Sequence, residues 1–124
     1  RYLKLKLNSG SAILANAFAA NDIRSTIYLL EKTLADFPGR RVVGFFNSRD
    51  DRPDRALVFE PFTRKFDNLM IRGSIPVHKF KGLSYRKVKD GESIEEFPQK
   101  DDIVFGFGNI RGLVQWLSNL EVIE

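Results

Sequence analysis

The sequence predicts an α/β domain with a mainly parallel sheet of about five to six strands, sandwiched between helices and bearing an antiparallel strand at its N-terminal edge. Three observations support this class. Short apolar runs alternate with segments of helical periodicity, which is typical of βαβ units. Residues 1–7 alternate apolar and polar side chains, as a half-buried strand does. The 124 residues, 43% of them hydrophobic, suffice for one domain with its own core, spanning residues 1–124.

Composition excludes several classes of protein. The chain has no cysteine and one histidine, which rules out a disulfide framework, a zinc cluster and a multi-histidine metal site. No apolar run approaches the roughly 20 residues of a membrane-spanning helix, and the first residues do not resemble a signal peptide. The formal net charge of +4 favours anionic partners such as nucleotides, acidic substrates or nucleic acid.

The first two strands are expected to form a hairpin. Leu3, Leu5 and Leu7 share one face of the first strand, and the lysines between them discourage pairing at a sheet edge. A turn at residues 8–11 leads into the run Ala12–Phe18. This run is apolar almost throughout, which predicts an inner strand covered on both faces.

A helix is expected from Asp22 to Phe37. Its apolar residues follow one another by four, three, four and three positions, which is the spacing of a helical stripe. These residues are Ile23, Ile27, Leu30, Leu34 and Phe37. Asn21 is the expected N-cap, and Pro38 with Gly39 ends the helix.

A strand is expected next at Arg41–Phe46, followed by six polar residues. Pro53 suits the first turn of a second helix that runs to about Phe66. Val58, Phe62 and Phe66 are four residues apart and form the expected apolar stripe of this helix. Pro61 is expected to kink the helix or to shorten it.

The last part of the chain has a weaker pattern. Residues 68–72 predict a third inner strand, whereas residues 73–100 show little periodicity. Within this irregular part, residues 75–77 suggest extended chain, residues 89–91 a turn, and residues 93–97 one helical turn. A final strand at 102–107, a tight turn and a helix at 110–120 complete the chain. The expected stripe of that helix is Ile110, Leu113, Val114, Leu117 and Leu120, with Trp116 at its margin.

Polar residues follow four of the expected strands. In parallel sheets, ligands bind beyond the carboxyl ends of the strands, so these loops are expected to converge on one edge. The loops are residues 16–22, 47–52, 72–74 and 108–111.

Each polar motif has a functional and a purely structural interpretation. The run Arg49–Arg52 places acids beside arginines, which suits a ligand site or a solvated loop whose charges neutralise one another. Asn21 can cap a helix, and Gly108–Asn109 can form a tight turn. His78 has no neighbouring catalytic partner, which favours a surface position.

A basic cluster with interleaved aromatic residues suits nucleic acid, an acidic polymer or solvent. It comprises Lys79, Lys81, Arg86, Lys87 and Lys89, with Phe80 and Tyr85. The chain contains neither a phosphate-binding P-loop nor a Gly-x-Gly-x-x-Gly fingerprint. A complete ATP-hydrolysing site is therefore not expected within these residues.

Three ordered motifs resemble those of a known enzyme family. Residues 16–22, Asn-Ala-Phe-Ala-Ala-Asn-Asp, resemble the Asp-x-Tyr-Ala-His-Asn-Pro motif that opens the C-terminal domain of Mur-type amide ligases. They are closer still to the version in poly-γ-glutamate synthases of the CapB/PgsB type, where Ser-Thr also follows, as at residues 25–26 here. Residues 47–55 and 105–110 resemble two further motifs of that branch, and Arg1 matches an arginine at the family's domain boundary.

The resemblance implies a Rossmann-like three-layer domain and an ATP-dependent, ADP-forming ligase. In that chemistry a carboxylate is phosphorylated and an amine then displaces phosphate, while fixed cations offset the repulsion between the anions. By resemblance, Arg1 and Arg52 are the expected catalytic residues, and Asn16, Ala20 and Asn21 contact the nucleotide. The expected substrate-binding residues are Arg49, Asp50, Asp51, Gly108 and Asn109.

The resemblance also implies partners that these residues do not supply. ATP and Mg²⁺ are the expected cofactors, with the P-loop and the magnesium ligands on a preceding central domain. Glutamate is the suspected amino acid, and membrane subunits and self-association are further expected partners, at a cytoplasmic location on the inner face of the membrane. The Asp-Asn-Pro-Arg motif of peptidoglycan ligases is absent near residues 74–77, which disfavours a cell-wall substrate. The alternative is a non-catalytic module that binds nucleotide or nucleic acid through residues 79–89; for the ligase itself, nucleic acid is not an expected partner.

Overall fold

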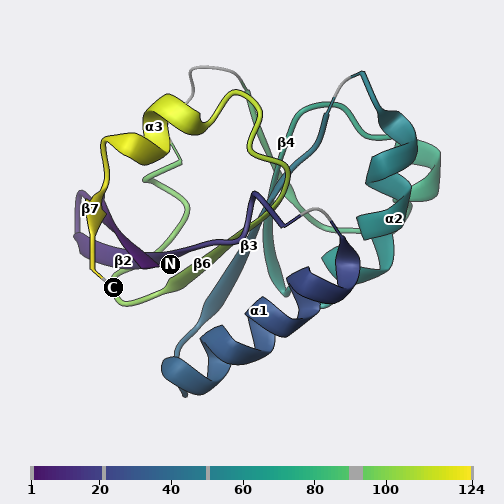
Figure 1. Ribbon diagram of the computed structural model, residues 1–124. Coiled ribbons are helices and arrows are strands. Elements are labelled where there is room, and N and C mark those ends of the chain that lie inside the picture. The colour runs from purple at the N-terminus through teal and green to yellow at the C-terminus, as the bar shows by residue number, and fades with distance from the viewer. Residues whose placement is uncertain (1, 21, 50, 90–93, 124) are drawn as a thin grey trace.

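The computed structural model describes residues 2–20, 22–49, 51–89 and 94–123 and shows one sheet with helices on both faces (Figure 1). The seven strands lie in the order β5-β4-β3-β6-β2-β1-β7. The five strands from β5 to β2 are parallel, and β1 pairs antiparallel with β2. The expected α/β class and the mainly parallel sheet are confirmed.

The predicted strands agree with the observed ones within one residue at each end, except that the strand expected at 12–18 lies two residues earlier, at 10–16. The strands are β1 (Tyr2–Leu7), β2 (Gly10–Asn16), β3 (Val42–Asn47), β4 (Asn68–Arg72), β5 (Arg86–Val88), β6 (Ile103–Gly108) and β7 (Glu121–Val122). The antiparallel strands lie at one edge of the sheet, as expected, but β1 is not the outermost strand, because the two-residue strand β7 pairs with its outer side. The short strands β5 and β7 were not expected, since three and two residues show no measurable period.

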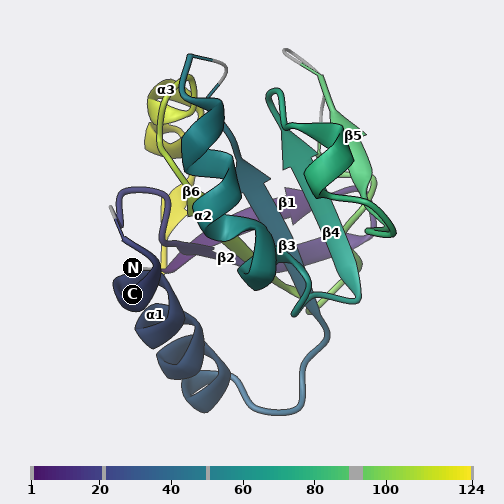
Figure 2. The same ribbon diagram turned by 90° about the vertical axis from the view of Figure 1, so that its right-hand side faces the viewer.

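Side chains alternate along the inner strands between two apolar cores. One core holds Ala15, Phe46 and Phe105 and is covered by α1 (Ile23–Asp36) and α2 (Pro53–Thr63). The other holds Leu14, Phe45 and Val104 and is covered by α3 (Val114–Ser118) and the chain around Ile94. Figure 2 shows α1 and α2 together on one side of the sheet.

Helix α1 begins directly after an aspartate that caps its N-terminus. Asp22 is the N-cap: its carboxylate accepts hydrogen bonds from the backbone N–H of Ser25 (2.8 Å) and from the Ser25 hydroxyl (3.0 Å). The expected N-cap, Asn21, is therefore wrong by one residue, and Asn21 itself lies outside the described residues. An aspartate caps as well as an asparagine does, so local propensity did not distinguish the two positions.

Helix α2 turns a different face to the core than its spacing suggested. Phe59 and Phe62 are buried, whereas Val58 is 55% exposed, so the expected stripe through Val58 is wrong. The helix continues through Pro61 and ends at Thr63, short of Phe66. Phe66 nevertheless reaches the same core from the turn that follows.

Helix α3 is much shorter than expected. Gly112 has a φ of +81°, outside the helical range, so residues 110–113 form a turn and the helix starts only at Val114. Leu113 and Leu117 are buried as expected, but Val114 is 61% exposed. The expected helix at 110–120 is therefore wrong in its first turn.

The irregular segment 73–100 contains one more short element. The expected extended chain at 75–77 is wrong at Val77, which opens a 3-10 turn, η1 (Val77–Lys79). One helical turn was expected at 93–97: the described part of it, residues 94–97, forms a turn closed by a hydrogen bond from the Phe97 N–H to the Ile94 carbonyl (3.3 Å), and Ser93 lies outside the described residues. The expected turn at 89–91 falls mostly outside the described residues.

Candidate functional site

A buried amide lies at the centre of the carboxyl edge of the sheet. Asn47 ends β3 and stands in register between Arg72 of β4 and Gly108 of β6. Its side chain is 0% exposed. Its Nδ2 donates to the carbonyls of Asn109 and Arg111, both at 2.9 Å, and its Oδ1 accepts from Arg72 Nη1 at 3.0 Å. Asn47 thus joins the ends of three neighbouring strands.

The loop after β6 closes back onto the same residue. The backbone N–H and the side-chain Nδ2 of Asn109 both donate to the carbonyl oxygen of Asn47, at 3.1 and 2.9 Å. The Asn109 Oδ1 in turn accepts from the Arg111 N–H at 2.9 Å. The reciprocal bonds between the two asparagines hold the loop in one geometry, and among the described residues no buried side-chain nitrogen or oxygen lacks a partner.

Two arginines enclose an aspartate beside this network. Arg49 contacts Asp51 in a bidentate pair, with Nε–Oδ1 at 3.0 Å and Nη2–Oδ2 at 2.6 Å, and Arg111 Nη1 reaches Asp51 Oδ2 at 3.0 Å. The hydrogen bonds from Arg49, together with the charges of both arginines, lower the pKa of Asp51 to about 2. Asp51 is therefore ionised at neutral pH and orients both guanidinium groups.

These residues line a cavity of about 230 Å³, which we call the arginine cavity. Its lining consists of Ser48, Arg49, Asp51, Arg72, Gly73, Arg111 and Gly112. Among the described lining residues there are three arginines and one aspartate, and Arg49 and Arg111 both contact that aspartate. Planar guanidinium groups bind carboxylates and phosphates in bidentate fashion, which suits this cavity to an anionic group.

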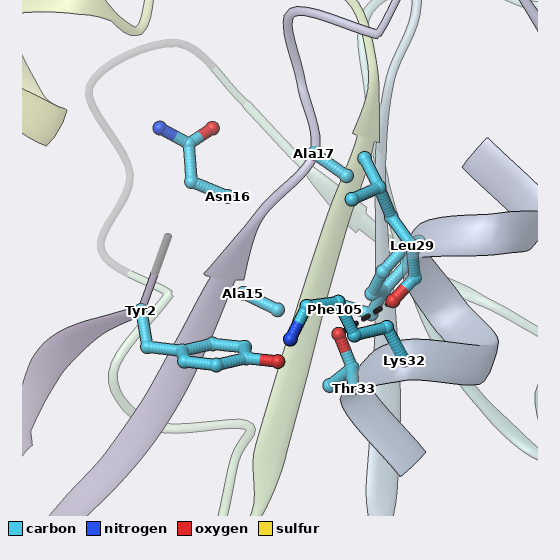
Figure 3. A pocket seen from close by; sticks show the side chains of 8 residues that line it. All are labelled: Tyr2, Ala15, Asn16, Ala17, Leu29, Lys32, Thr33 and Phe105. Atoms are coloured by element: carbon cyan, nitrogen blue, oxygen red, sulfur yellow. Dashed lines mark hydrogen bonds between the residues drawn. The ribbon is translucent and has the colours of Figure 1, made fainter. Parts of the chain in front are cut away.

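A second cavity, of about 160 Å³, lies beside the end of β2 and is called the apolar cavity (Figure 3). Ala15, Ala17, Leu29 and Phe105 supply most of its walls. Polar groups stand at its border: Tyr2, Asn16, Lys32 and Thr33. Small alanines leave a space that suits a flat apolar ring rather than a whole large ligand.

The polar border of the apolar cavity is held by its own hydrogen bonds. The Tyr2 hydroxyl donates to Asp36 Oδ2 at 2.6 Å, and Lys32 Nζ contacts the same oxygen at 3.1 Å. Burial, reinforced by the bond to Asp36, raises the pKa of Tyr2. The same bonds lower the pKa of Asp36 and raise that of Lys32, so Lys32 stays cationic near the cavity.

The structure places the expected nucleotide-binding residues at the turn between β2 and α1. Asn16 is half-buried, and its Oδ1 accepts from the Phe18 N–H at 3.3 Å. Figure 3 shows its side chain directed away from Lys32 and Thr33. The Ala20 N–H donates to the Ala17 carbonyl at 3.2 Å, which tightens the turn.

The expected substrate-binding residues Arg49, Asp51 and Asn109 come together at the carboxyl edge, as the loop positions predicted. Gly108 has a φ of +106°, and a side chain there would meet the Asn47 carbonyl oxygen at 2.4 Å. Only a glycine at position 108 leaves room for this approach, and the group that comes close to it is the Asn47 carbonyl of this chain.

Of the two expected catalytic residues, Arg1 and Arg52, the structure describes only Arg52. Arg52 precedes α2, bonds to Asp54 at 3.4 Å and lines neither cavity. Arg1 and Asp50 lie outside the described residues, as does Asn21.

Sequence reasoning did not select three residues that shape the site. Asn47, Arg72 and Arg111 all lay in the loops expected to converge, and Asn47 also opens the family-like motif at residues 47–55. The bonds that join them span 25 to 64 residues of sequence, so no local motif predicts these bonds. For Arg72 and Arg111, position at the carboxyl end of neighbouring strands was the one signal in the sequence.

Two other expectations concern surface and metal sites. His78 is exposed, as predicted. In the described part of the chain, no group of three or more histidine, aspartate or glutamate side chains is placed to hold a metal ion. Nor does any helix there have the length and apolar character needed to cross a membrane.

The chain was compared with known proteins. The family model described as "Poly-gamma-glutamate synthase CapB C-terminal domain" matches residues 2–121. No curated protein and no solved structure gave a significant match. The family match covers every residue of both cavities.

Proposed function

The chain belongs to the family of poly-gamma-glutamate synthase CapB C-terminal domains, and on this basis we propose that it forms the nucleotide- and amino-acid-binding wall of an ATP-dependent, ADP-forming amide ligase. The observation that carries the proposal is the pair of cavities, one apolar beside the end of β2 and one lined by arginines beyond the ends of β3 and β4.

The apolar cavity suits the nucleoside side of such a site. Its flat apolar walls fit a base, and it opens beside the β2–α1 turn that carries Asn16 and Ala20. Lys32 supplies a positive charge near the border. When bound, ATP would supply the phosphoryl group that activates a carboxylate. In this proposal the magnesium ligands lie on a separate domain.

The arginine cavity suits the incoming amino acid. A guanidinium pair held by Asp51 binds a carboxylate without having to reorganise, and this positions the amine of the same molecule. The charges also offset repulsion where an anionic acceptor meets a phosphorylated carboxylate. Glutamate, with two carboxylates, is the amino acid that we propose.

The experiment joins the chain to a P-loop domain of the same ligase family and measures glutamate-dependent ADP release. Ala17→Leu fills the apolar cavity, and we expect it to raise the KM for ATP roughly tenfold or more, with little change in the KM for glutamate. Arg111→Ala removes one guanidinium group from the arginine cavity, and we expect it to raise the KM for glutamate with little change in the KM for ATP. Arg24→Ala, on the exposed side of α1, is the matched control.

The selectivity decides the result. If both variants change the two KM values equally, or if neither changes them, the assignment of the cavities is wrong. Circular dichroism of each variant separates these outcomes from loss of fold.

A further inference from the structure

One segment concentrates the positive charge of the molecule. Between Asp67 and Asp90 the chain has no acidic residue, but it has six lysines and arginines. The formal charge of this segment is therefore +6, whereas that of the whole chain is +4. The other residues sum to −2, so the basic character of the protein comes from this segment.

The fold places these charges along one margin of the sheet. Lys79, Lys81, Arg86, Lys87 and Lys89 are all exposed, and together we call them the basic edge. They belong to η1, to the outermost parallel strand β5 and to the chain beside them. Figure 2 shows β5 at the margin of the sheet beside β4.

The basic edge leads to the arginine cavity. Arg72, which lines that cavity, pairs in register with Val88, the last residue of β5. Because β4 and β5 are parallel, Lys89 follows β5 at the same edge of the sheet to which Arg72 belongs. Exposed cations on and beside β5 thus begin at the edge of the sheet to which Arg72 belongs, and several cations in a row suit an extended anion better than a single small one.

The aromatic residues of this segment are buried or half-buried. Phe80 is 3% exposed, and Tyr85 packs against the core that α1 and α2 cover. Arg86 lies over the ring of Phe97, 5.8 Å from its centroid. Proteins that bind single-stranded nucleic acid stack bases on exposed aromatic rings. The basic edge presents cations without such rings, which favours a polycarboxylate over nucleic acid.

We propose that the basic edge binds an extended polycarboxylate, an acidic γ-glutamyl chain, and aligns its end with the arginine cavity. This inference rests on the proposed function, since it makes the basic edge the acceptor-chain subsite of the same ligase. Each residue of such a chain carries one carboxylate, so several lysines engage it together while no single pair is strong.

The test measures binding of fluorescein-labelled deca-γ-glutamate to the 124-residue chain by anisotropy. The triple variant Lys79→Gln/Lys81→Gln/Lys87→Gln should weaken binding roughly tenfold or more, and raising salt from about 50 to about 200 mM should weaken wild-type binding more steeply than that of the variant. The control Lys6→Gln/Arg24→Gln/Lys100→Gln removes the same charge from exposed positions elsewhere and should stay within about twofold.

Two results overturn the inference. Equal weakening by both triple variants would mean that only net charge matters. Tighter binding of a labelled ten-nucleotide thymidine strand than of deca-γ-glutamate would make the edge a nucleic-acid site.

The proposed function is tested separately by ADP release of the wild type with free glutamate in the joined enzyme. If the wild type releases ADP normally but the basic-edge variant shows no selective loss of deca-γ-glutamate binding, this inference is wrong and the proposed function stands. Absent ADP release in the wild type counts against the ligase, whatever the binding result.

Discussion

At the scale of single residues, the candidate site is organised by the side chain of Asn47. It is fully buried, yet its amide satisfies two carbonyls and one guanidinium from segments distant in sequence. An amide is suited to this place because it donates and accepts at once without carrying charge. An aspartate there would face the carbonyls of Asn109 and Arg111 with an acceptor instead of a donor.

Replacing Asn47 by alanine should destabilise the fold and loosen the site. Two carbonyl oxygens each lose a hydrogen-bond donor and Arg72 loses an acceptor, so we expect a loss of about 2–4 kcal/mol in the free energy of unfolding, measured by urea denaturation. Asn119→Ala, at an exposed position after α3, is the control and should stay within about 0.5 kcal/mol. A loss as small as that of the control would show that the network contributes little.

The carboxylate of Asp51 supplies a pH-dependent prediction. Its pKa is about 2 instead of 3.8, so its contribution to stability is complete above pH 3.8 and is lost as the pH falls toward 2. Arg49→Gln should raise this pKa toward 3.8, and Arg111→Gln should raise it less, because the bonds from Arg49 are the largest cause. Carbon-13 NMR titration of the carboxyl group measures both values. Asp54, which pairs with Arg52, serves as the reference group, and a pKa of Asp51 that does not respond to Arg49→Gln contradicts the geometry.

At the scale of elements, chain ends and turns decide where helices and strands stop. α1 begins at the residue after Asp22 because that side chain satisfies the N–H of Ser25. α3 starts late because Gly112 has a φ outside the helical range. In each case one residue sets the boundary of an element whose interior follows apolar spacing.

The cap of α1 can be tested directly. Asp22→Ala removes the acceptor for the Ser25 N–H, and we expect the melting temperature to fall by a few degrees. Asp22→Asn retains a side-chain oxygen and should restore most of the loss. Thermal unfolding followed by circular dichroism measures both, and equal losses in the two variants would mean that the cap is not responsible.

The end of β6 can be tested with a matched pair of glycines. Gly108→Ala combines a φ of +106° with a clash against Asn47 and Phe46, and should cost roughly 3 kcal/mol or more. Gly39→Ala has a φ of +77° but no neighbouring atom within 4 Å, so it should cost about 1–2 kcal/mol. Urea denaturation gives the difference between them. Equal costs would show that Gly108 is needed only for its backbone angle.

At the scale of the whole molecule, one sheet separates two apolar cores that share its strands. Neighbouring residues of β3, such as Phe45 and Phe46, point into opposite cores. Loss of either core would therefore expose the inner strands of both. The ion pair between Arg41 and the buried Asp102, at 3.0 Å, further joins the amino ends of β3 and β6.

This sharing predicts a single cooperative unfolding transition. Trp116 lies against Phe45 in the core that α3 covers, with ring centroids 6.2 Å apart, so its fluorescence reports that core. Far-ultraviolet circular dichroism reports mainly α1 and α2 on the opposite face. Both signals should give the same midpoint in urea. Two separate midpoints would mean that the two faces unfold independently.

The regular interior of the fold was predictable from the sequence. The bounds of β4, the span of α1 and the convergence of the loops after β3, β4 and β6 follow from runs, spacing and the rule for parallel sheets. The errors fall where the local sequence pattern is misleading or too short to be recognised. Val58 has helical spacing but faces solvent, and β7 is too short for any period.

The candidate site was predictable in place but not in composition. The sequence indicated that Arg49, Asp51 and Asn109 lie near one edge, and the structure brings them together with Arg72, Arg111 and Asn47. In the structure Arg52 pairs with Asp54 and lines neither cavity. The nucleotide and substrate roles stay predictions, to be tested by the KM measurements above.

What the sequence by itself determined is the class of fold, the order of its main elements and the family, because apolar periodicity and ordered motifs are local properties of the chain. Only the tertiary structure decided that β6 lies between β2 and β3, which places Asn109 on Asn47 and Arg111 on Asp51. The physical reason is that strand order and side-chain pairing depend on contacts between residues far apart in sequence. These contacts form only when the strands have paired and both faces of the sheet are packed.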